Sequence, residues 1–582
     1  MTSGTGDAVR LDNSLRVPAR GASVIGAVDP DEIIHVNVIT RRRPDAPPLP
    51  GPPYWTTTSR GRRRFLSREE FGERFGSTQE DLDIVTDFAV RHDLAVAETS
   101  RARRSVLISG SAGAMERALG VTLQYYQTGS ERYRGHDGYV HVPAELAGVI
   151  EGVLGLDNRR LGWRASNGGS GGTPITPLDV AKAYNFPEDL DASGQTIGIL
   201  EFAGGFVVDD SGNPSDVDTY IRDLGIPLPV VKVGYGQNTP LGNSQNSPDL
   251  EVTGDIVIAG CVAQGATIVL YFGPGIPDAM QGQLPKPNEL DWSMLLLAAI
   301  HDSVNKPSVL SISWSAPENL WPSTAIGLLG PLFAEANIMG ITVLASSGDY
   351  GASGYPETDP HFDGQPHVHY PASDPLVTGC GGTKFVMSPF DELTWNDYPS
   401  GGATGGGVSS HFQDSSWYPW QEGIQIYPWH EGQLIGSTPS GRGVPDIAGN
   451  ASPSTGYDIV FYGQALSTYP YGLFGGTSAV APFYAGLIAV INSVAPVTVG
   501  YLNSILYESG GPAMFHDVFD QWNNNYSTVA GYVAVKGWDA CTGWGSINGG
   551  ALLTLMLSRN AGCVATFRTW VENVAKALGI WQ

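Results

Sequence analysis

The chain has 582 residues, 42% of them hydrophobic, and a formal net charge of -25. This length exceeds one ordinary domain, and the hydrophobic content excludes an intrinsically disordered protein. The acidic excess argues against a nucleic-acid partner, because phosphate would be repelled. The first 15 residues contain no apolar core of a signal peptide, and we predict no apolar run long enough to span a membrane.

The charge divides the chain into two parts. Residues 1–164 carry 22 basic side chains, all of them Arg, and 21 acidic ones, whereas residues 165–582 carry 11 basic and 37 acidic ones. An acidic domain that is poor in Lys avoids the positive self-repulsion that unfolds proteins at low pH. We expect arginines of the first part to pair with carboxylates of the second at neutral pH. Acidification would weaken these pairs.

The first part reads as a small α+β domain over residues 1–165. Its predicted strands are 33–40, 105–109 and 121–126, and its predicted helices are 77–94, with Ser77 or Thr78 as cap, and 111–120, which ends on Gly120. This order predicts helices on one face of an antiparallel sheet. The Gly- and Ser-rich composition of residues 166–176 predicts a flexible linker that is open to cleavage.

The second part, residues 177–582, alternates apolar strands with helices. The predicted strands are 196–202, 266–272, 307–314 and 341–347, and the predicted helices are 293–304 and 329–340. This pattern indicates an α/β domain with a parallel sheet flanked by helices, in which functional residues follow the carboxyl ends of strands. The cysteines have no metal or disulfide spacing, so we predict mostly buried free thiols; they are Cys261, Cys380, Cys541 and Cys563.

A candidate nucleophile lies in the segment FGGTSAVAPFYAG, where Gly475 and Gly476 precede Thr477 and Ser478 and an apolar helix follows. Glycines permit close approach of a substrate, and a helix start favours a developing oxyanion. Alternatively, Thr477 or Ser478 only caps the helix. The pattern G-T-S-x-x-x-P resembles the nucleophile segment of subtilisin-like enzymes, which also use a His followed by Gly-Thr. None of the 11 histidines here has that context, so another group must accept the proton.

Two carboxylates are candidates for that group. Ser247 and Pro248 predict a helix start, and Glu251 and Asp255, four residues apart, then lie on one helix face. Two carboxyls in a partly dry cleft share a proton, because one pKa rises. We interpret Glu251 as the general base and Asp255 as its support. The alternative is a solvated acidic helix edge.

A third carboxylate follows the strand 341–347, in the sequence Ser346-Ser347-Gly348-Asp349. A protonated Asp349 would donate a hydrogen bond to an oxyanion, whereas an ionised one would repel it. This role requires low pH or strong desolvation. The alternative is an aspartate that only closes a turn.

Several further segments carry a family resemblance: ITPLDVAKAYNFP (175–187), PSVLSISW (307–314), GCGGTKF (379–385), GGGVSSHF (405–412), GRGVPDIAGN (441–450), GGTSAVAP (475–482) and GWDACTGWGS (537–546). Together they resemble the sedolisin family, the serine-carboxyl peptidases, over nearly the whole chain. The resemblance implies a subtilisin-like catalytic domain behind a ferredoxin-like inhibitory prodomain that assists folding. It also implies a triad of Ser478, Glu251 and Asp255 with Asp349 at the oxyanion, and a supporting network of Glu201 and Trp314.

The resemblance further implies one structural Ca²⁺ ion. Its ligands would be the side chains of Asp517 and Asp539 and the carbonyls of Val518, Val535 and Gly537, and such hard oxygen donors suit this cation.

The implied partners are protein or peptide substrates and the chain's own prodomain, acting as an intramolecular inhibitor that is removed autocatalytically at low pH. The family implies secretion, and we expect a monomer. His369 stands where a family member has an acid in the substrate cleft, which leaves side-chain preference open, and residues after about 556 have no assigned counterpart.

Three other functions stay open at this point. The first is a subtilisin-type enzyme with an unidentified His, which a rate maximum in alkali would reveal. The second is a catalytically inactive binding protein on the same scaffold, which a self-maturing Ser478→Ala variant would indicate. The third is a Ca²⁺-binding structural domain without any hydrolytic activity.

Overall fold

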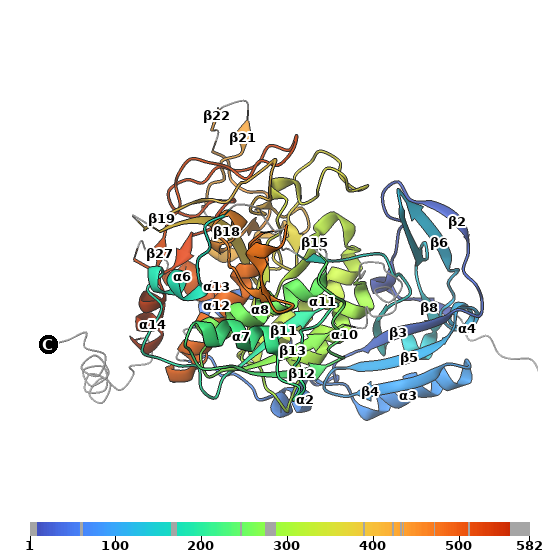
Figure 1. The fold of residues 1–582 in the computed structure, drawn as a ribbon. Coiled ribbons are helices and arrows are strands. Elements are labelled where there is room, and N and C mark those ends of the chain that lie inside the picture. Colours follow the sequence, from blue (N-terminus) through green and yellow to red (C-terminus); the bar gives the residue numbers. More distant parts are fainter. Residues whose placement is uncertain are drawn as a thin grey trace, which may run out of the picture.

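The structure is a computed structural model. It describes residues 8–58, 62–164, 172–244, 247–273, 287–387, 390–421, 424–430, 433–434, 436–470, 472–509 and 513–558. Cys563, the segment after Ser558 and part of the predicted linker lie outside these ranges. In Figure 1 a smaller N-terminal unit, drawn in blue, lies beside a larger unit that contains the rest of the chain.

The N-terminal unit is built on antiparallel sheets, as predicted. Four strands follow the order β4-β5-β3-β9, three follow β2-β6-β7, and β1 pairs with β8. The strands are β1 (Ala8–Arg10), β2 (Ser23–Ala27), β3 (Ile33–Thr40), β4 (Ala95–Ser100), β5 (Ser105–Ser111), β6 (Gln124–Thr128), β7 (Glu131–Gly135), β8 (His141–Pro143) and β9 (Ile150–Leu154). The helices are α1 (Pro52–Thr57), α2 (Arg68–Phe75), α3 (Gln79–Arg91), α4 (Ala112–Leu119) and α5 (Ala144–Ala147).

Local sequence signals explain the ends of these helices. The Thr78 hydroxyl accepts a hydrogen bond from the Asp81 amide and so caps α3. Gly120 ends α4 in the left-handed region at φ 59°, where a glycine is least strained. Helices α3 and α4 cover one face of the four-stranded sheet, which confirms the predicted layering. The predicted strand 121–126 begins three residues later, as β6.

The larger unit contains an eight-stranded sheet, in the order β12-β13-β11-β14-β16-β18-β19, with β24 pairing β18. All neighbours are parallel except β18 and β19. The strands are β11 (Thr196–Glu201), β12 (Val230–Tyr235), β13 (Thr267–Phe272), β14 (Val309–Ile312), β16 (Thr342–Ser346), β18 (Thr378–Met387), β19 (Phe390–Thr394) and β24 (Ile447–Asn450). Small pairings join β20 (Gly407–Val408) to β23 (Gly443–Val444), β21 (Trp429–His430) to β22 (Gln433–Leu434), β25 (Val460–Phe461) to β26 (Gln464–Ala465), and β27 (Phe515–His516) to β28 (Ser546–Ile547).

Helices cover both faces of this sheet. Helices α8 and α12 pack together on one face, and α10 and α11 pack on the other. The helices of the unit are α6 (Pro177–Ala183), α7 (Ser215–Asp223), α8 (Pro248–Val262), α10 (Glu289–Ile300), α11 (Ser323–Ile338), α12 (Val480–Val494), α13 (Asn503–Ser509) and α14 (Gly549–Ser558). The parallel sheet between two helical layers confirms the predicted α/β class.

Two sequence-based expectations need correction. The run 307–314 is not one strand, because β14 ends at Ile312 and a separate strand, β15 (Trp314–Pro317), leaves the main sheet. The segment Thr477–Val494 is long and apolar enough to cross a membrane, contrary to our prediction, but 89% of it is buried inside the protein, as in a core helix. Three cysteines are free and buried as predicted, namely Cys261, Cys380 and Cys541.

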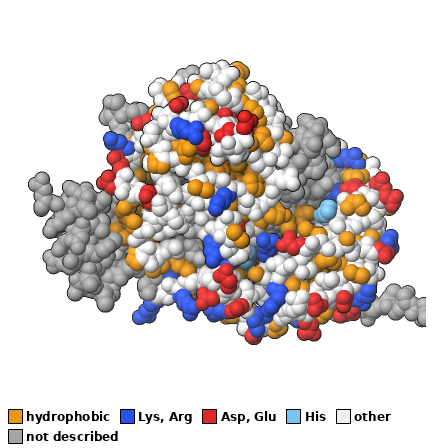
Figure 2. Space-filling view, turned by 60° about the horizontal axis from the view of Figure 1, so that its bottom comes forward, with side chains coloured by type: hydrophobic (Ala, Val, Ile, Leu, Met, Phe, Trp, Pro, Cys, Tyr) orange, Lys and Arg blue, Asp and Glu red, His pale blue; other side chains and the backbone are white. Residues whose placement is uncertain are grey.

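The N-terminal unit docks on α10 and α11 through the uncovered face of its four-stranded sheet. Side chains of both units share one hydrophobic cluster, in which Ile39 and Leu154 meet Leu328 and Trp292. Charged side chains gather on the part of the surface in Figure 2 where this unit lies, whereas the larger unit shows mostly uncharged side chains on that face. The docked interface is therefore apolar at its centre, and any ion pairs within it are shielded from water.

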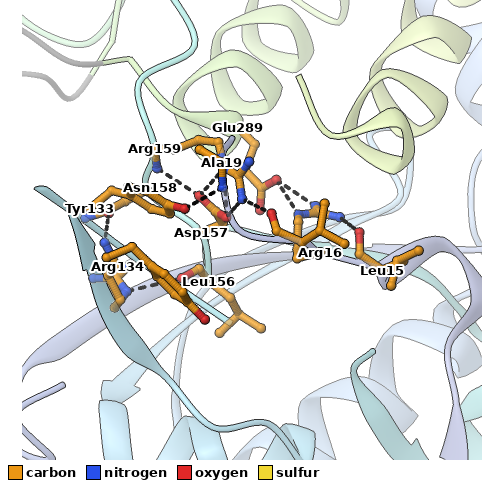
Figure 3. Close-up of polar contacts among 12 residues, drawn as sticks. Leu15, Arg16, Ala19, Tyr133, Arg134, Leu156, Asp157, Asn158, Arg159 and Glu289 are labelled. Atoms are coloured by element: carbon orange, nitrogen blue, oxygen red, sulfur yellow. Dashed lines mark hydrogen bonds and ion pairs between the residues drawn. The ribbon is translucent and has the colours of Figure 1, made fainter. Parts of the chain in front are cut away.

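Figure 3 shows one such pair. Arg16, from the N-terminal unit, donates from Nη2 to Glu289 Oε2 at 2.6 Å, and both side chains are almost fully buried. Glu289 begins α10, and its second oxygen accepts the Gly155 amide at 2.9 Å. Nearby, Asp157 and Arg159 form a second buried pair at 2.6 Å. Charged groups of the two units thus meet inside the interface.

A buried carboxyl in the sheet makes stability depend on pH. Glu392 on β19 accepts the Thr383 hydroxyl at 2.7 Å and the hydroxyls of Tyr184 and Ser546, and burial raises its pKa to about 7. A raised pKa means that the folded state binds this proton more tightly, so the stability it contributes is present below the usual pKa and lost as pH rises through about 7.

We therefore expect the Ser478→Ala variant to lose stability between pH 5 and pH 8, by on the order of 3 kcal/mol from Glu392. Scanning fluorimetry across this range measures the change, and Glu392→Gln should flatten the pH dependence. An unchanged slope in this variant would assign the effect to other groups.

Candidate active site

The predicted catalytic residues converge at one edge of the large sheet. Strands β11, β14 and β16 are adjacent and parallel, so their carboxyl ends meet there. Glu201 is the last residue of β11, Ser313 and Trp314 follow β14, and Asp349 follows β16. The nucleophile segment lies in front of this edge, because the Ser478 hydroxyl bonds to the Ser313 carbonyl at 3.3 Å.

Helix α8 supplies two carboxyls from its first turns. The Ser247 hydroxyl caps the helix by accepting the Asp249 amide, and Pro248 occupies the first helical position, as predicted. Glu251 and Asp255 are both 0% exposed, so the alternative of a solvated acidic edge is wrong. Asp255 Oδ2 accepts the Ser313 hydroxyl at 2.7 Å. Ser313 therefore connects Asp255 with the segment that contains Ser478.

Ser478 occupies a short 3₁₀ turn ahead of α12, and no side chain caps that turn or the helix. The reading of Thr477 or Ser478 as a simple cap is therefore wrong. Gly476 has φ 101°, a conformation that side chains rarely adopt. At Gly475 an added Cβ would lie 2.6 Å from the Ala451 carbonyl oxygen. The two glycines thus allow the tight turn that presents Ser478 to the strand ends.

Asp349 is fastened to the same turn. Its Oδ1 atom accepts both the amide and the hydroxyl of Thr477, each at 2.8 Å. The Thr477 hydroxyl oxygen in turn accepts the Gly348 amide at 3.1 Å. Asp349 is 2% exposed, so it is not a solvated turn residue. Thr477 fixes the carboxyl of Asp349 next to Ser478.

The carboxyls at this edge are poorly ionised. Burial raises the pKa of Asp255 well above its usual value, and the charges of Glu251 and Glu201 raise it further. Burial and Glu251 also raise the pKa of Glu201. Burial likewise raises the pKa of Asp349, against the opposing effect of its two bonds from Thr477, and Glu251 adds to the rise. Several protons are therefore held among these carboxyls well above ordinary carboxyl pKa values.

The predicted supporting pair is in contact. Trp314 Nε1 donates to Glu201 Oε2 at 2.9 Å, and both residues are buried. Trp314 is also the first residue of β15. The pair therefore ties the end of β11 to that strand.

A strand of the N-terminal part pairs with β15 beside these residues. Trp163 and Arg164 form β10 (Trp163–Arg164), which pairs antiparallel with Ser315 and Trp314 of β15. Arg164 Nη1 donates to the Ser247 carbonyl at 2.7 Å, and the charge of Glu251 partly offsets the lowering of its pKa by burial. The chain that precedes the linker therefore covers the carboxyls of α8.

His369 does not act on Ser478 in this arrangement. It belongs to β17 (His369–Tyr370), which pairs with the other edge of β15. Its Nδ1 lies 2.7 Å from the Ser315 hydroxyl and its Nε2 lies 2.8 Å from the Gly354 carbonyl. Burial lowers its pKa to about 4. Both ring nitrogens are thus engaged away from the nucleophile, so His369 is not the catalytic His that the subtilisin-type alternative requires.

Sequence reasoning missed three residues of the site: Ser313, Thr477 as a bonding partner, and Arg164. The end of the SISW run held the signal for Ser313, because polar residues at strand ends line such sites. As a local pattern, Thr477 indicates only a helix cap. Arg164 contributes only to the charge balance of residues 1–164.

The predicted calcium residues lie together at the loops around β27. Asp517 Oδ2 accepts the Gly537 amide at 2.8 Å, and Asp539 Oδ2 accepts the Val535 amide at 3.0 Å. The other Asp517 oxygen is buried and has no hydrogen-bond partner among the described residues. No group of three or more His, Cys, Asp or Glu side chains suited to a metal occurs in the described ranges. A cation here would depend on backbone carbonyls.

Comparison with known proteins agrees with this arrangement. A family model described as the activation domain of pro-kumamolisin matches residues 20–159. The chain is 38% identical to kumamolisin of Bacillus sp. (strain MN-32) over 481 residues, which covers 79% of this chain and 80% of kumamolisin. It is 29% identical to the tripeptidyl-peptidase sed5 of Aspergillus fumigatus, covering 86% and 88% of the two chains.

A solved structure is also similar. Pseudomonas sedolisin, a serine-carboxyl proteinase in complex with pseudo-iodotyrostatin, matches with a TM-score of 0.52 and 25% identity, over 67% of this chain and all of that chain. The chain therefore belongs to the sedolisin family of serine-carboxyl peptidases and is a peptidase precursor with an N-terminal activation domain.

Proposed function

We propose that this precursor matures into an endopeptidase that acts in acid, with Ser478 as nucleophile, Glu251 as general base supported by Asp255, and protonated Asp349 at the oxyanion. The observation that carries the proposal is the set of buried carboxyls with raised pKa around Ser478. A carboxylate base suits an acidic medium, because general acid–base catalysis is most efficient when the pKa of the catalytic group lies near the working pH.

The reaction follows from these roles. Glu251 removes the Ser478 proton as Oγ attacks the substrate carbonyl carbon, and Asp255 holds the proton-sharing pair in place. The oxyanion accepts a hydrogen bond from the proton on Asp349. Glu251 then returns its proton to the leaving amine, which yields an acyl-enzyme on Ser478. Water, deprotonated by Glu251, hydrolyses this ester and restores the free hydroxyl.

Digestion of a denatured protein from pH 2 to 8 tests this function. The wild-type enzyme should cleave internal bonds in acid, and Ser478→Ala and Glu251→Ala should not. A substrate with a blocked amino terminus separates internal cleavage from the removal of tripeptides, which the names of several relatives indicate for those proteins. An alkaline optimum, or cleavage by Ser478→Ala, would contradict the assignment.

We further propose that residues 1–165 inhibit the enzyme until cleavage within 166–176 separates them from the catalytic domain, residues 177–582. In support, β10 lies along β15 as a bound substrate strand would, and its direction leads toward Ser313. Removal by Ser478 of the same molecule would make maturation autocatalytic. Extracellular action and a monomeric state belong to the same proposal.

One structural Ca²⁺ ion would be held by Asp517 and Asp539 with the carbonyls of Val518, Val535 and Gly537. The buried Asp517 oxygen without a hydrogen-bond partner supports this set, because it needs a cation or a proton. Lys536 carries an opposing charge near Asp517. The ion would fix the loops around β27 and take no part in the reaction.

Removal of calcium should therefore lower thermal stability and leave the chemistry of the surviving folded enzyme unchanged. We expect EGTA to lower the unfolding midpoint of the Ser478→Ala precursor by several degrees, since bound ligand stabilises by mass action. Asp517→Ala should abolish this difference, whereas Asp189→Ala, at an exposed aspartate, should preserve it. An equal EGTA effect in both variants would refute the assigned ligands.

A further inference from the structure

A second ion cluster lies inside the interface between prodomain and catalytic domain. Glu335 on α11 is 1% exposed, and its Oε1 accepts Nη2 of Arg42 at 2.6 Å. Arg104 places a second guanidinium 3.6 Å from the same oxygen. The other Glu335 oxygen lies 2.8 Å from Nε2 of His301, which ends α10. One catalytic-domain carboxylate thus holds two prodomain arginines.

We propose that Glu335 is the acid-sensing residue of a latch that releases the prodomain when pH falls. This inference rests on the proposed maturation and assigns its trigger to one side chain. The latch consists of Glu335 with Arg42 and Arg104, and we keep that name for these three residues. Both arginines leave with the prodomain, whereas Glu335 and His301 remain on the catalytic domain.

The direction of the pH effect follows from linkage. Although burial opposes it, Arg42, His301 and Arg104 together lower the Glu335 pKa from 4.5 to about 2. The docked state therefore holds this proton less tightly than a solvent-exposed carboxylate would. Its contribution to docking is complete above the ordinary pKa of about 4.5 and is lost as pH falls toward 2.

The surroundings of Glu335 strengthen this response. The charged groups that face it are Arg42 after β3, Arg104 before β5, and His301 at the end of α10. Glu151 on β9 pairs with Arg104 at 2.6 Å. Once Glu335 is protonated, the guanidinium groups of Arg42 and Arg104 remain close together in this site, and Glu151, whose side chain is partly exposed, pairs with Arg104 alone. Repulsion between the two guanidinium groups favours separation of the two domains.

The Arg16–Glu289 pair provides a contrasting control. It crosses the same interface and is equally buried, but burial and the nearby Asp157 raise the Glu289 pKa despite the opposing effect of Arg16. Arg159 and His136, whose pKa burial lowers to about 4, also lie near this pair. A raised pKa means that acid does not weaken docking through Glu289. The two buried carboxylates of the interface therefore respond to acid in opposite directions.

Docking can be measured without catalysis in the full-length Ser478→Ala precursor. A donor and an acceptor dye are placed at Val90→Cys in the prodomain and Val304→Cys in the catalytic domain, where the native side chains are 63% and 87% exposed. Cys563 is replaced by Ser, and the three buried cysteines are kept. Energy transfer is followed from pH 2 to 7 in a urea series, and tryptophan fluorescence reports whether the catalytic domain stays folded.

Glu335→Gln should lower the docking constant at pH 6 by at least tenfold, and at most by about 300-fold, the full equivalent of the change from 4.5 to 2. The change should stay below this upper limit, because His301 remains on the catalytic domain and still lowers the Glu335 pKa after undocking. The difference from the parent should vanish near pH 2. Glu289→Gln should keep the parent's loss of docking on acidification, because it retains Glu335. If Glu335→Gln does not fold, Arg42→Gln should give the same pH profile with a smaller amplitude.

Equal undocking in acid by the parent and by both glutamine variants would overturn the latch. A pH dependence of docking that Glu289→Gln flattens as much as Glu335→Gln does would also overturn it. The proposed function fails separately. If undocking in acid depends on Glu335 but the wild-type chain never cleaves itself, the latch stands and the maturation mechanism does not.

Discussion

We expect the Ser478→Ala precursor to remain uncut at every pH from 2 to 8 and the wild-type chain to convert to a smaller mature form in acid. The expected loss of peptide hydrolysis is at least 10⁴-fold, because removal of a nucleophile leaves only binding and oxyanion stabilisation. The structure supports this size of effect, since the glycine turn at Gly475 and Gly476 presents the hydroxyl of Ser478 and no neighbouring hydroxyl on that turn replaces it: the Thr477 hydroxyl is engaged by Asp349.

Gel electrophoresis of precursor incubated across the pH series measures maturation. Ser493→Ala is the matched control, because Ser493 lies near the other end of α12, where its hydroxyl bonds to Asp191 and Val490 carbonyls. This control should mature like the wild type. A Ser478→Ala chain that still matures would show that Ser478 does not perform the cleavage, and it would favour the inactive-scaffold alternative.

The second large effect concerns Asp349. Asp349→Ala should lower kcat by 10²- to 10³-fold, as expected when one oxyanion donor is lost. Asp349→Asn should lose less, because an amide retains an acceptor for Thr477 and supplies a donor that needs no proton from the medium. The comparison separates loss of the donor from loss of the contact with Thr477.

The pH profile provides the sharper readout. Burial raises the Asp349 pKa, so the wild-type carboxyl donates only below that raised value, and activity falls as pH rises through it. Asp349→Asn has no proton to lose, so its remaining activity should extend to higher pH. Values of kcat/KM measured from pH 2 to 8 for the wild type and for Asp349→Asn test this expected extension. An identical alkaline limb in the two profiles would show that another group sets it.

The sequence predicted the elements that carry the site because the signals were local. Ser247 and Pro248 mark the start of α8, and a spacing of four places Glu251 and Asp255 on one face. The apolar strand before Asp349 has the parallel-sheet pattern, and its carboxyl end lies where ligands bind in such sheets. In each case neighbouring residues decide the conformation.

Contacts between distant segments could not be predicted in this way. Ser313 bonds to Asp255, 58 residues away, and to the Ser478 segment, 165 residues away, and no local pattern encodes either distance. The break between β14 and β15 arises because β15 pairs with β10 and β17 instead of continuing in the main sheet. The charge balance indicated arginines that meet carboxylates, but only the fold distinguishes Glu335 from Glu289.

The hydroxyl of Ser478 should become acylated in acid with the help of Glu251. A peptide ester is mixed with the mature enzyme at pH 4, the reaction is quenched within the first turnover, and the acylated residue is located by mass spectrometry. The account predicts an acyl group on Ser478 in the wild-type enzyme and a much slower burst in Glu251→Ala. An acyl group on another residue, or an equally fast burst without Glu251, would contradict it.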